Sequence, residues 1–137
     1  TITATLTGAG TLTKSGAGTF TLGSANLYTG GTNLSGGTLV AGDVGSFGTG
    51  TVTLSGELTV TAGGALSDSG VLSVGGQSRI SASGQSVVLD SANDFDTLSI
   101  SAASATVNDL NALDLGAITL SGSLSVTAGG ADLLQNL

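Results

Sequence analysis

Aliphatic and hydroxyl side chains alternate along most of the chain. The pattern is clear in Thr-Ile-Thr-Ala-Thr-Leu-Thr at 1–7, in Thr-Phe-Thr-Leu at 19–22 and in Leu-Thr-Val-Thr at 58–61. Because successive side chains of a β-strand point to opposite faces, this alternation predicts many short strands with one aliphatic face. Glycine pairs and Ser-Gly or Ala-Gly steps separate the strands and supply turn chemistry. No segment keeps a helical apolar spacing, and residues 109–115 come nearest to one.

An internal repeat gives the alternation a longer period. The sequence TVTLSGELTVTAGGA at 51–65 matches AITLSGSLSVTAGGA at 117–131, with 11 of 15 positions identical. In this alignment Gly56 corresponds to Gly122. Repeats in which apolar positions recur in phase are typical of stacked architectures. The offset suggests three coils of roughly 22 residues, the length of one turn of a β-solenoid.

Two all-β architectures compete, a sandwich or barrel and a parallel β-helix. A sandwich fills a thick core with aromatic side chains, whereas only 3% of these residues are aromatic. The chain also lacks proline, as expected where nearly every strand donates its N–H groups to a neighbour. We therefore expect an all-β parallel β-helix with roughly 20–22 residues per coil, about 30 Å long at about 4.8 Å per coil.

Residues 8–54 carry an ordered set of motifs. They are a Gly-x-Gly-Thr-Leu-x-Lys-x-Gly opening at 8–16, an Asn-x-Tyr-x-Gly-Gly-Thr turn at 26–32, a Gly-Thr-Leu strand at 37–39 and a Gly-Thr-Gly step at 48–50. In this order they resemble the passenger-associated transport repeat of autotransporter proteins. From about residue 55 to 137, the words LTVTAGGAL, LNALDLG and LSVTAGGA are similar to repeats of filamentous-haemagglutinin-like exoproteins.

Both resemblances imply a right-handed parallel β-helix in a large protein of a Gram-negative bacterium. They imply an extracellular or cell-surface location, a repeat protein that acts in cell adhesion as an adhesin or stalk, and coil-by-coil folding that helps to draw the chain across the outer membrane. Because the chain begins with Thr, we expect residues 1–137 to be a single β-helix segment of a longer protein.

Composition excludes several functions. The formal net charge is −7, and Lys14 and Arg79 are the only cationic side chains. No basic patch can form, so we expect no nucleic-acid partner. The longest apolar runs are far too short to span a bilayer, so we expect no membrane insertion of this segment. The chain has no cysteine and no histidine, which excludes disulfides, thiolate catalysis and a Ser–His pair.

Carboxylates supply the remaining candidate chemistry. Asp90, Asp94 and Asp96 lie in the run DSANDFD and form a calcium candidate, because calcium prefers oxygen ligands. The run lacks the glycine and closing glutamate of an EF-hand, which favours a solvated turn. Paired carboxylates also serve glycosidases, but the chain has few arginines and aromatic rings for a sugar site. We therefore expect no enzyme, no cofactor and no metal.

Tyr28 is the only tyrosine, so it is a candidate for binding. It occupies the aromatic position of the transport repeat, which favours packing over a turn. Several asparagines are predicted at corners, where their side chains stack into hydrogen-bonded ladders. They are Asn26, Asn33, Asn93, Asn108 and Asn111.

The sequence thus predicts a non-enzymatic stalk or adhesin segment. Two alternatives stay open: a subunit of a self-assembling extracellular filament, and a β-helix surface that binds a receptor directly. The expected partners are a host-surface receptor or glycan and, through exposed sheet ends, other copies of the chain end to end.

Overall fold

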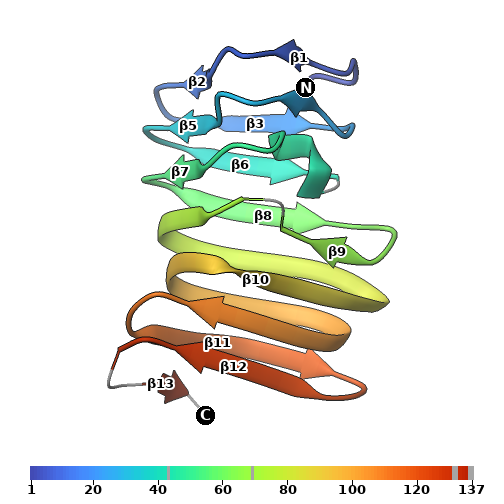
Figure 1. Ribbon diagram of the computed structural model, residues 1–137, viewed down its shortest axis with the longest axis vertical. Helices are drawn as coiled ribbons and strands as arrows, with labels where there is room; N and C mark the ends of the chain where they lie inside the picture. The colour runs from blue at the N-terminus through green and yellow to red at the C-terminus, as the bar shows by residue number, and fades with distance from the viewer. Residues whose placement is uncertain (43, 69, 131–132, 136–137) are drawn as a thin grey trace.

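The computed structural model describes residues 1–42, 44–68, 70–130 and 133–135, and its elements are strands joined by tight corners (Figure 1). In this part of the chain no helix is long and apolar enough to cross a membrane. The elements are β1 (Thr7–Gly8), β2 (Leu12–Lys14), β3 (Thr19–Leu22), β4 (Leu27–Tyr28), β5 (Thr32–Leu34), β6 (Thr38–Ala41), the 3-10 helix η1 (Val44–Phe47), β7 (Val52–Leu54), β8 (Glu57–Thr61), β9 (Leu66–Ser67), β10 (Leu72–Asp109), β11 (Leu113–Leu120), β12 (Leu124–Ala128) and β13 (Leu133–Gln135).

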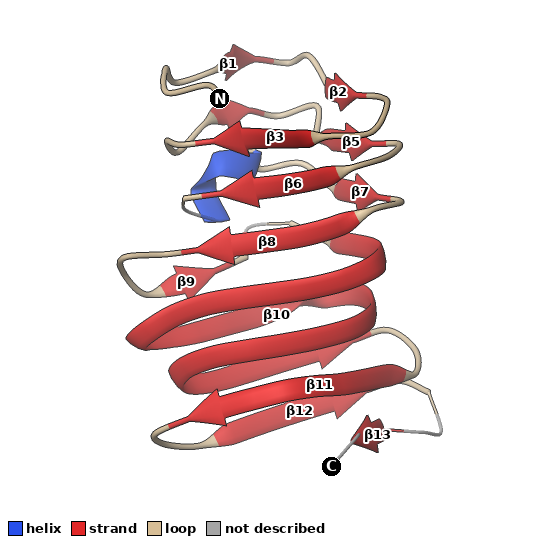
Figure 2. Cartoon of the chain, turned by 180° about the vertical axis from the view of Figure 1, so that it is seen from behind, coloured by secondary structure: helices blue, strands red, loops and turns tan. Residues whose placement is uncertain are grey.

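The strands wind around three faces of a solenoid, and every strand pair among the described residues is parallel (Figure 2). Face A contains β2, β5, β7 and residues 72–74 of β10. Face B contains β3, β6, β8 and residues 78–81 of β10. Face C contains β9, β12 and the segments of β10 that pair with them, residues 87–88 and 105–109. The predicted parallel β-helix is confirmed, while its right-handed sense stays a prediction.

A column of inward-facing aliphatic side chains runs through the whole stack on face B. Its buried members have at most 3% of their surface exposed. Five of its steps follow the strand register, and Ile80 and Ile100 lie side by side where β10 winds back beneath itself. The members are Ile2, Leu22, Ala41, Val60, Ile80, Ile100 and Ile118. The column therefore marks six turns of about 19 residues.

The turns are slightly shorter than predicted, and they are unequal. Among the paired strands, the register offset is short between Leu98 and Leu115 and long between Leu66 and Val87. Corners and one register shift between Leu98 and Ile100 absorb this variation, because face A repeats one constant offset through three successive steps from Leu12 to Leu72. Six turns at about 4.8 Å each give a stack about 29 Å long.

The internal repeat does not correspond to three whole coils, as its length had suggested. In the first copy, β7 lies on face A and β8 on face B. In the second copy, residues 118–120 pair with residues 100–102 on face B, and β12 lies on face C. With turns of about 19 residues, the offset from Gly56 to Gly122 exceeds three turns by one face. The second copy of the repeat is therefore rotated by one face about the solenoid axis relative to the first copy.

This rotation predicts the distance between labels at equivalent positions of the two copies. Thr59 and Ser125 are equivalent, yet they lie on faces B and C. Nitroxide labels on Thr59→Cys and Ser125→Cys should show little dipolar broadening in continuous-wave EPR spectra. Labels on Thr59→Cys and Ala117→Cys, which are three rungs apart on face B, should show strong broadening at about 14 Å. Equal broadening of the two pairs would contradict the rotation.

Candidate functional site

Tyr28 is buried beneath a turn. Only 3% of its surface is exposed, and β4, which carries it, pairs with β1. Its hydroxyl group shares a hydrogen bond with Thr32 Oγ1. Gly48 has a φ of +70°, and a Cβ there would lie 3.1 Å from the ring, so this glycine allows the turn to close over the tyrosine. Burial raises the pKa of the phenol, and the bond to Thr32 partly offsets that rise. With its ring covered, Tyr28 offers no exposed platform, which supports a structural role.

Polar side chains gather along the stretch that leads from face B through face C to face A, a region we call the polar corner. Three of them take the place of a missing backbone carbonyl, because each accepts a backbone N–H from the preceding turn. The bonds join Leu6 N to Asn26 Oδ1 at 2.7 Å, Leu72 N to Asn93 Oδ1 at 2.9 Å, and Phe95 N to Asp109 Oδ1 at 2.8 Å. Since buried N–H groups need partners, these side chains keep the inter-turn ladder complete at the corner.

The two buried asparagine amides extend these contacts along the axis. Asn26 Nδ2 donates to the Ser46 carbonyl at 2.5 Å, and Asn93 Nδ2 donates to Asp68 Oδ2 at 2.7 Å. The predicted hydrogen-bonding role of corner asparagines is therefore confirmed at Asn26 and Asn93. Asn33 differs from the prediction, because it lies exposed within β5.

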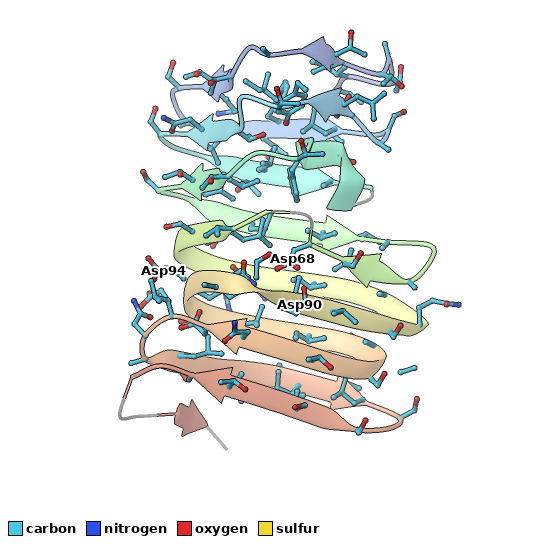
Figure 3. All side chains as sticks on the ribbon, in the orientation of Figure 1. Asp68, Asp90 and Asp94 are labelled. Carbon is cyan, nitrogen blue, oxygen red and sulfur yellow. The ribbon has the colours of Figure 1, made fainter. Side chains whose placement is uncertain are left out.

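The acidic run 90–96 lies on β10 next to the polar corner, and Figure 3 shows Asp68, Asp90 and Asp94. Asp94 accepts Asn111 Nδ2 at 2.9 Å and the Ser73 hydroxyl at 3.4 Å. Asp94 and Asp96 line a surface hollow of about 340 Å³, whereas Asp90 does not.

The described residues place no set of metal-ligating side chains around these carboxylates. Within residues 1–42, 44–68, 70–130 and 133–135, no three acidic, histidine or cysteine side chains are placed to hold a metal ion. All three side chains lie on the outward side of β10, where Asp90 and Asp96 are exposed and Asp94 is half-buried, but only Asp94 and Asp96 line the same hollow. The calcium hypothesis for Asp90, Asp94 and Asp96 therefore has no supporting geometry in the described residues.

Two carboxylates of the polar corner, Asp68 and Asp109, were not singled out from the sequence. Burial raises the pKa of both, and the hydrogen bonds that they accept partly offset that rise. For Asp109 the donors are the N–H groups of Phe95 and Asn111, and the charge of Asp94 raises its pKa further. Sequence periodicity could not identify them, because the polar-corner residues 26, 46, 68, 93 and 109 do not recur at a fixed interval.

Removal of the Tyr28 ring should destabilise the fold. We expect Tyr28→Phe to cost about 1 kcal/mol, because Thr32 loses a buried partner. Tyr28→Ala should cost about 3–5 kcal/mol through loss of packing. Leu27→Ala is the matched control, since that neighbour is 64% exposed and should change stability by less than about 0.5 kcal/mol. Urea unfolding measures all three, and a Tyr28→Ala variant as stable as the control would contradict the structural role.

The raised pKa values predict that the protein is stabilised by mild acid. A carboxyl whose folded-state pKa lies above its unfolded value binds more protons when folded, so the free energy of unfolding falls as pH rises through that window. The urea midpoint should therefore increase as pH is lowered from 7 towards 3.8, the ordinary pKa for Asp109. Asp109→Asn should flatten this dependence.

The exposed Asp96→Asn variant makes the same charge change and serves as control. If both variants keep the parent's pH dependence, or if the parent loses stability on acidification across this window, the assignment to Asp109 is wrong.

Comparison with known proteins places these features in a repeat family. A passenger-associated transport repeat matches residues 12–41, within the segment where the sequence motifs suggested it. No curated protein and no solved structure matches the chain. A family described as repeats of unknown function (DUF5649) matches residues 35–101 and 102–135, and its first match spans nearly the same length as the offset of the internal repeat. Since these matches cover more than half of the sequence, the chain belongs to this family of repeats.

Proposed function

We propose that this chain is a non-enzymatic stalk segment of a bacterial surface-exposed or secreted exoprotein. The observation that carries the proposal is the unbroken aliphatic column from Ile2 to Ile118, which runs through all six turns. Backbone hydrogen bonds between turns run parallel to the column. Such a stack resists bending because successive turns are hydrogen-bonded to each other along several faces.

The family matches support the location. The passenger-associated transport repeat associates the chain with autotransporter passengers, which are exported to the cell surface. From the sequence resemblance of residues 55–137 to haemagglutinin-like exoproteins we propose further that the segment belongs to an adhesin, with the stalk holding adhesive parts away from the cell. On this proposal the solenoid is right-handed and residues 1–137 form one continuous segment.

The polar corner supports a structural rather than a catalytic role. Asp109 is 2% exposed and accepts two backbone N–H groups, and Asp68 accepts the Asn93 amide and backbone N–H groups of the next turn. Carboxylates held in this way complete the inter-turn ladder and have little freedom for acid–base chemistry.

A second candidate is a filament subunit. In the described residues, β1 pairs with β4 alone and β12 with β10 alone, so each strand has an open edge. Open parallel edges are templates for another chain, and head-to-tail pairing of two different edges generates an open polymer.

Insertion into a working stalk tests the first proposal. The chain, placed between the tip and the stalk of an autotransporter passenger, should be exported and should move an epitope on the tip outward by about 29 Å. Leu58→Asp, which buries a charge in the core, is the folding control and should reduce surface display. Periplasmic retention of the parent chain would contradict the stalk. Concentration-dependent growth of rods in sedimentation velocity would support the filament, and a strict monomer would contradict it.

A further inference from the structure

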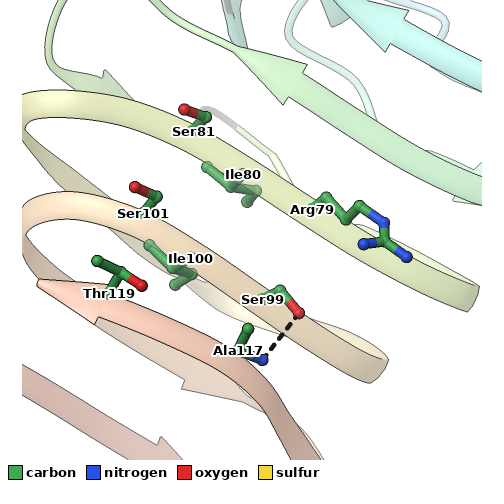
Figure 4. A pocket seen from close by; sticks show the side chains of 8 residues that line it. All are labelled: Arg79, Ile80, Ser81, Ser99, Ile100, Ser101, Ala117 and Thr119. Carbon is green, nitrogen blue, oxygen red and sulfur yellow. Dashed lines mark hydrogen bonds between the residues drawn. The ribbon is translucent and has the colours of Figure 1, made fainter.

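A shallow groove of about 240 Å³ crosses the outer surface of face B over three successive turns (Figure 4). Outward side chains stack in columns there: Ser81 above Ser101 above Thr119, with Arg79 on the same upper turn as Ser81. Ile80 and Ile100 lie beneath its floor, with their side chains buried in the core. Most outward side chains of these three turns are small, whereas the turns above carry larger ones such as Thr59. The surface is therefore hollowed at the three lower turns.

A register shift builds the lower part of the groove. Leu98 pairs with Leu115 but Ile100 pairs with Ile118, so one residue, Ser99, faces both Gly116 and Ala117. Ser99 Oγ accepts the Ala117 N–H at 3.2 Å, and this leaves the Ser99 hydroxyl hydrogen free to donate. A Cβ at position 116 would lie 2.5 Å from Ser99 Oγ, so glycine is required for this arrangement. Bulges of this kind often re-aim side chains at binding sites.

Charge distinguishes this groove from the rest of an acidic surface. The chain carries nine acidic and two basic side chains. Lys14 Nζ is engaged by the carbonyl groups of Gly16 and Gly36, at 2.7 and 3.1 Å. The Arg79 guanidinium at the groove donates to the neutral Gln77 side chain, and no ion pair joins it to an acid within the described residues. It therefore has donors left for an anion, and guanidinium binds a carboxylate with two parallel hydrogen bonds.

We propose that the groove binds a short oligosaccharide that carries one carboxylate, of the sialic-acid or uronic-acid type. Arg79 pairs with the carboxylate, the hydroxyls of Ser99 and Ser101 bond sugar hydroxyls on adjacent rungs, and Ala117 contacts the apolar face of a ring. The three rungs span about 10 Å, which limits the occupant to a short chain.

The backbone and the net charge narrow the ligand class. Within the groove, residues 78–81 pair with 58–61 and residues 100–102 pair with 118–120, so a peptide could add as another strand only at the lower edge of β11 and not across the groove. A polyanion would face the formal charge of −7, which repels it, whereas a single carboxylate interacts mainly with Arg79. The proposal does not rest on the stalk role, since a rigid spacer needs no groove.

Titration of the 137-residue chain with sialyllactose and with a glucuronic-acid disaccharide, followed by NMR chemical shifts, tests this site. At least one of the two should cause saturable shifts at Ser99, Ser101 and Ala117, while lactose should not. Arg79→Gln should weaken binding by about tenfold or more, since it removes a charge-assisted pair. The affinity of Arg79→Lys should fall between those of the parent and Arg79→Gln, because lysine keeps the charge without the planar guanidinium group.

Two further variants separate the groove from general effects. Gln85→Glu makes the same change in net charge at an exposed position away from the groove and should bind like the parent. Ala117→Leu fills the groove while Arg79 remains, and it should abolish binding while the urea midpoint stays close to that of the parent. Absence of shifts with both acidic sugars, equal binding of lactose, unchanged binding by Arg79→Gln, or tighter binding of an acidic peptide would overturn the proposal.

Discussion

The hydrogen bond from each turn to the next is the interaction on which the rest of this structure depends. A parallel ladder tolerates no slip along a strand, because a shift of one residue would exchange the aliphatic and hydroxyl faces. The turns nevertheless differ in length. Face A keeps a constant register offset, although the number of residues per turn varies. The extra or missing residues are therefore accommodated at corners and at one bulge.

The polar corner follows from the same requirement. Where the chain leads from face B through face C to face A, three backbone N–H groups bond to side chains of the next turn and not to its carbonyl groups. Side-chain oxygens of Asn26, Asn93 and Asp109 accept them instead. An aspartate can therefore be buried here without a cation, since two N–H donors compensate part of the cost of its desolvation. Asp68 and Asp109, which the sequence did not single out, therefore accept backbone N–H groups in the fold.

The groove on face B arises from the shortened lower turns. Where Ser99 faces two residues, the Oγ atom replaces a backbone partner, and a small residue is required opposite. The register shift at Ser99 replaces one regular backbone hydrogen bond between turns, and it also shapes the groove beside Arg79 on the outer surface.

The sequence by itself determined the strand pattern and the parallel solenoid, because alternation, glycine placement and the lack of proline are local properties of the chain. It also placed asparagines correctly at Asn26 and Asn93. It did not determine the turn length or the meaning of the internal repeat, since a repeat records similarity and not the face on which each copy lies. Only the tertiary structure decided that the copies are rotated, that Asp68 and Asp109 share a corner, and that Ser99 meets Gly116. These contacts depend on how many residues each corner absorbs, and that number is set by packing between turns rather than by the local sequence.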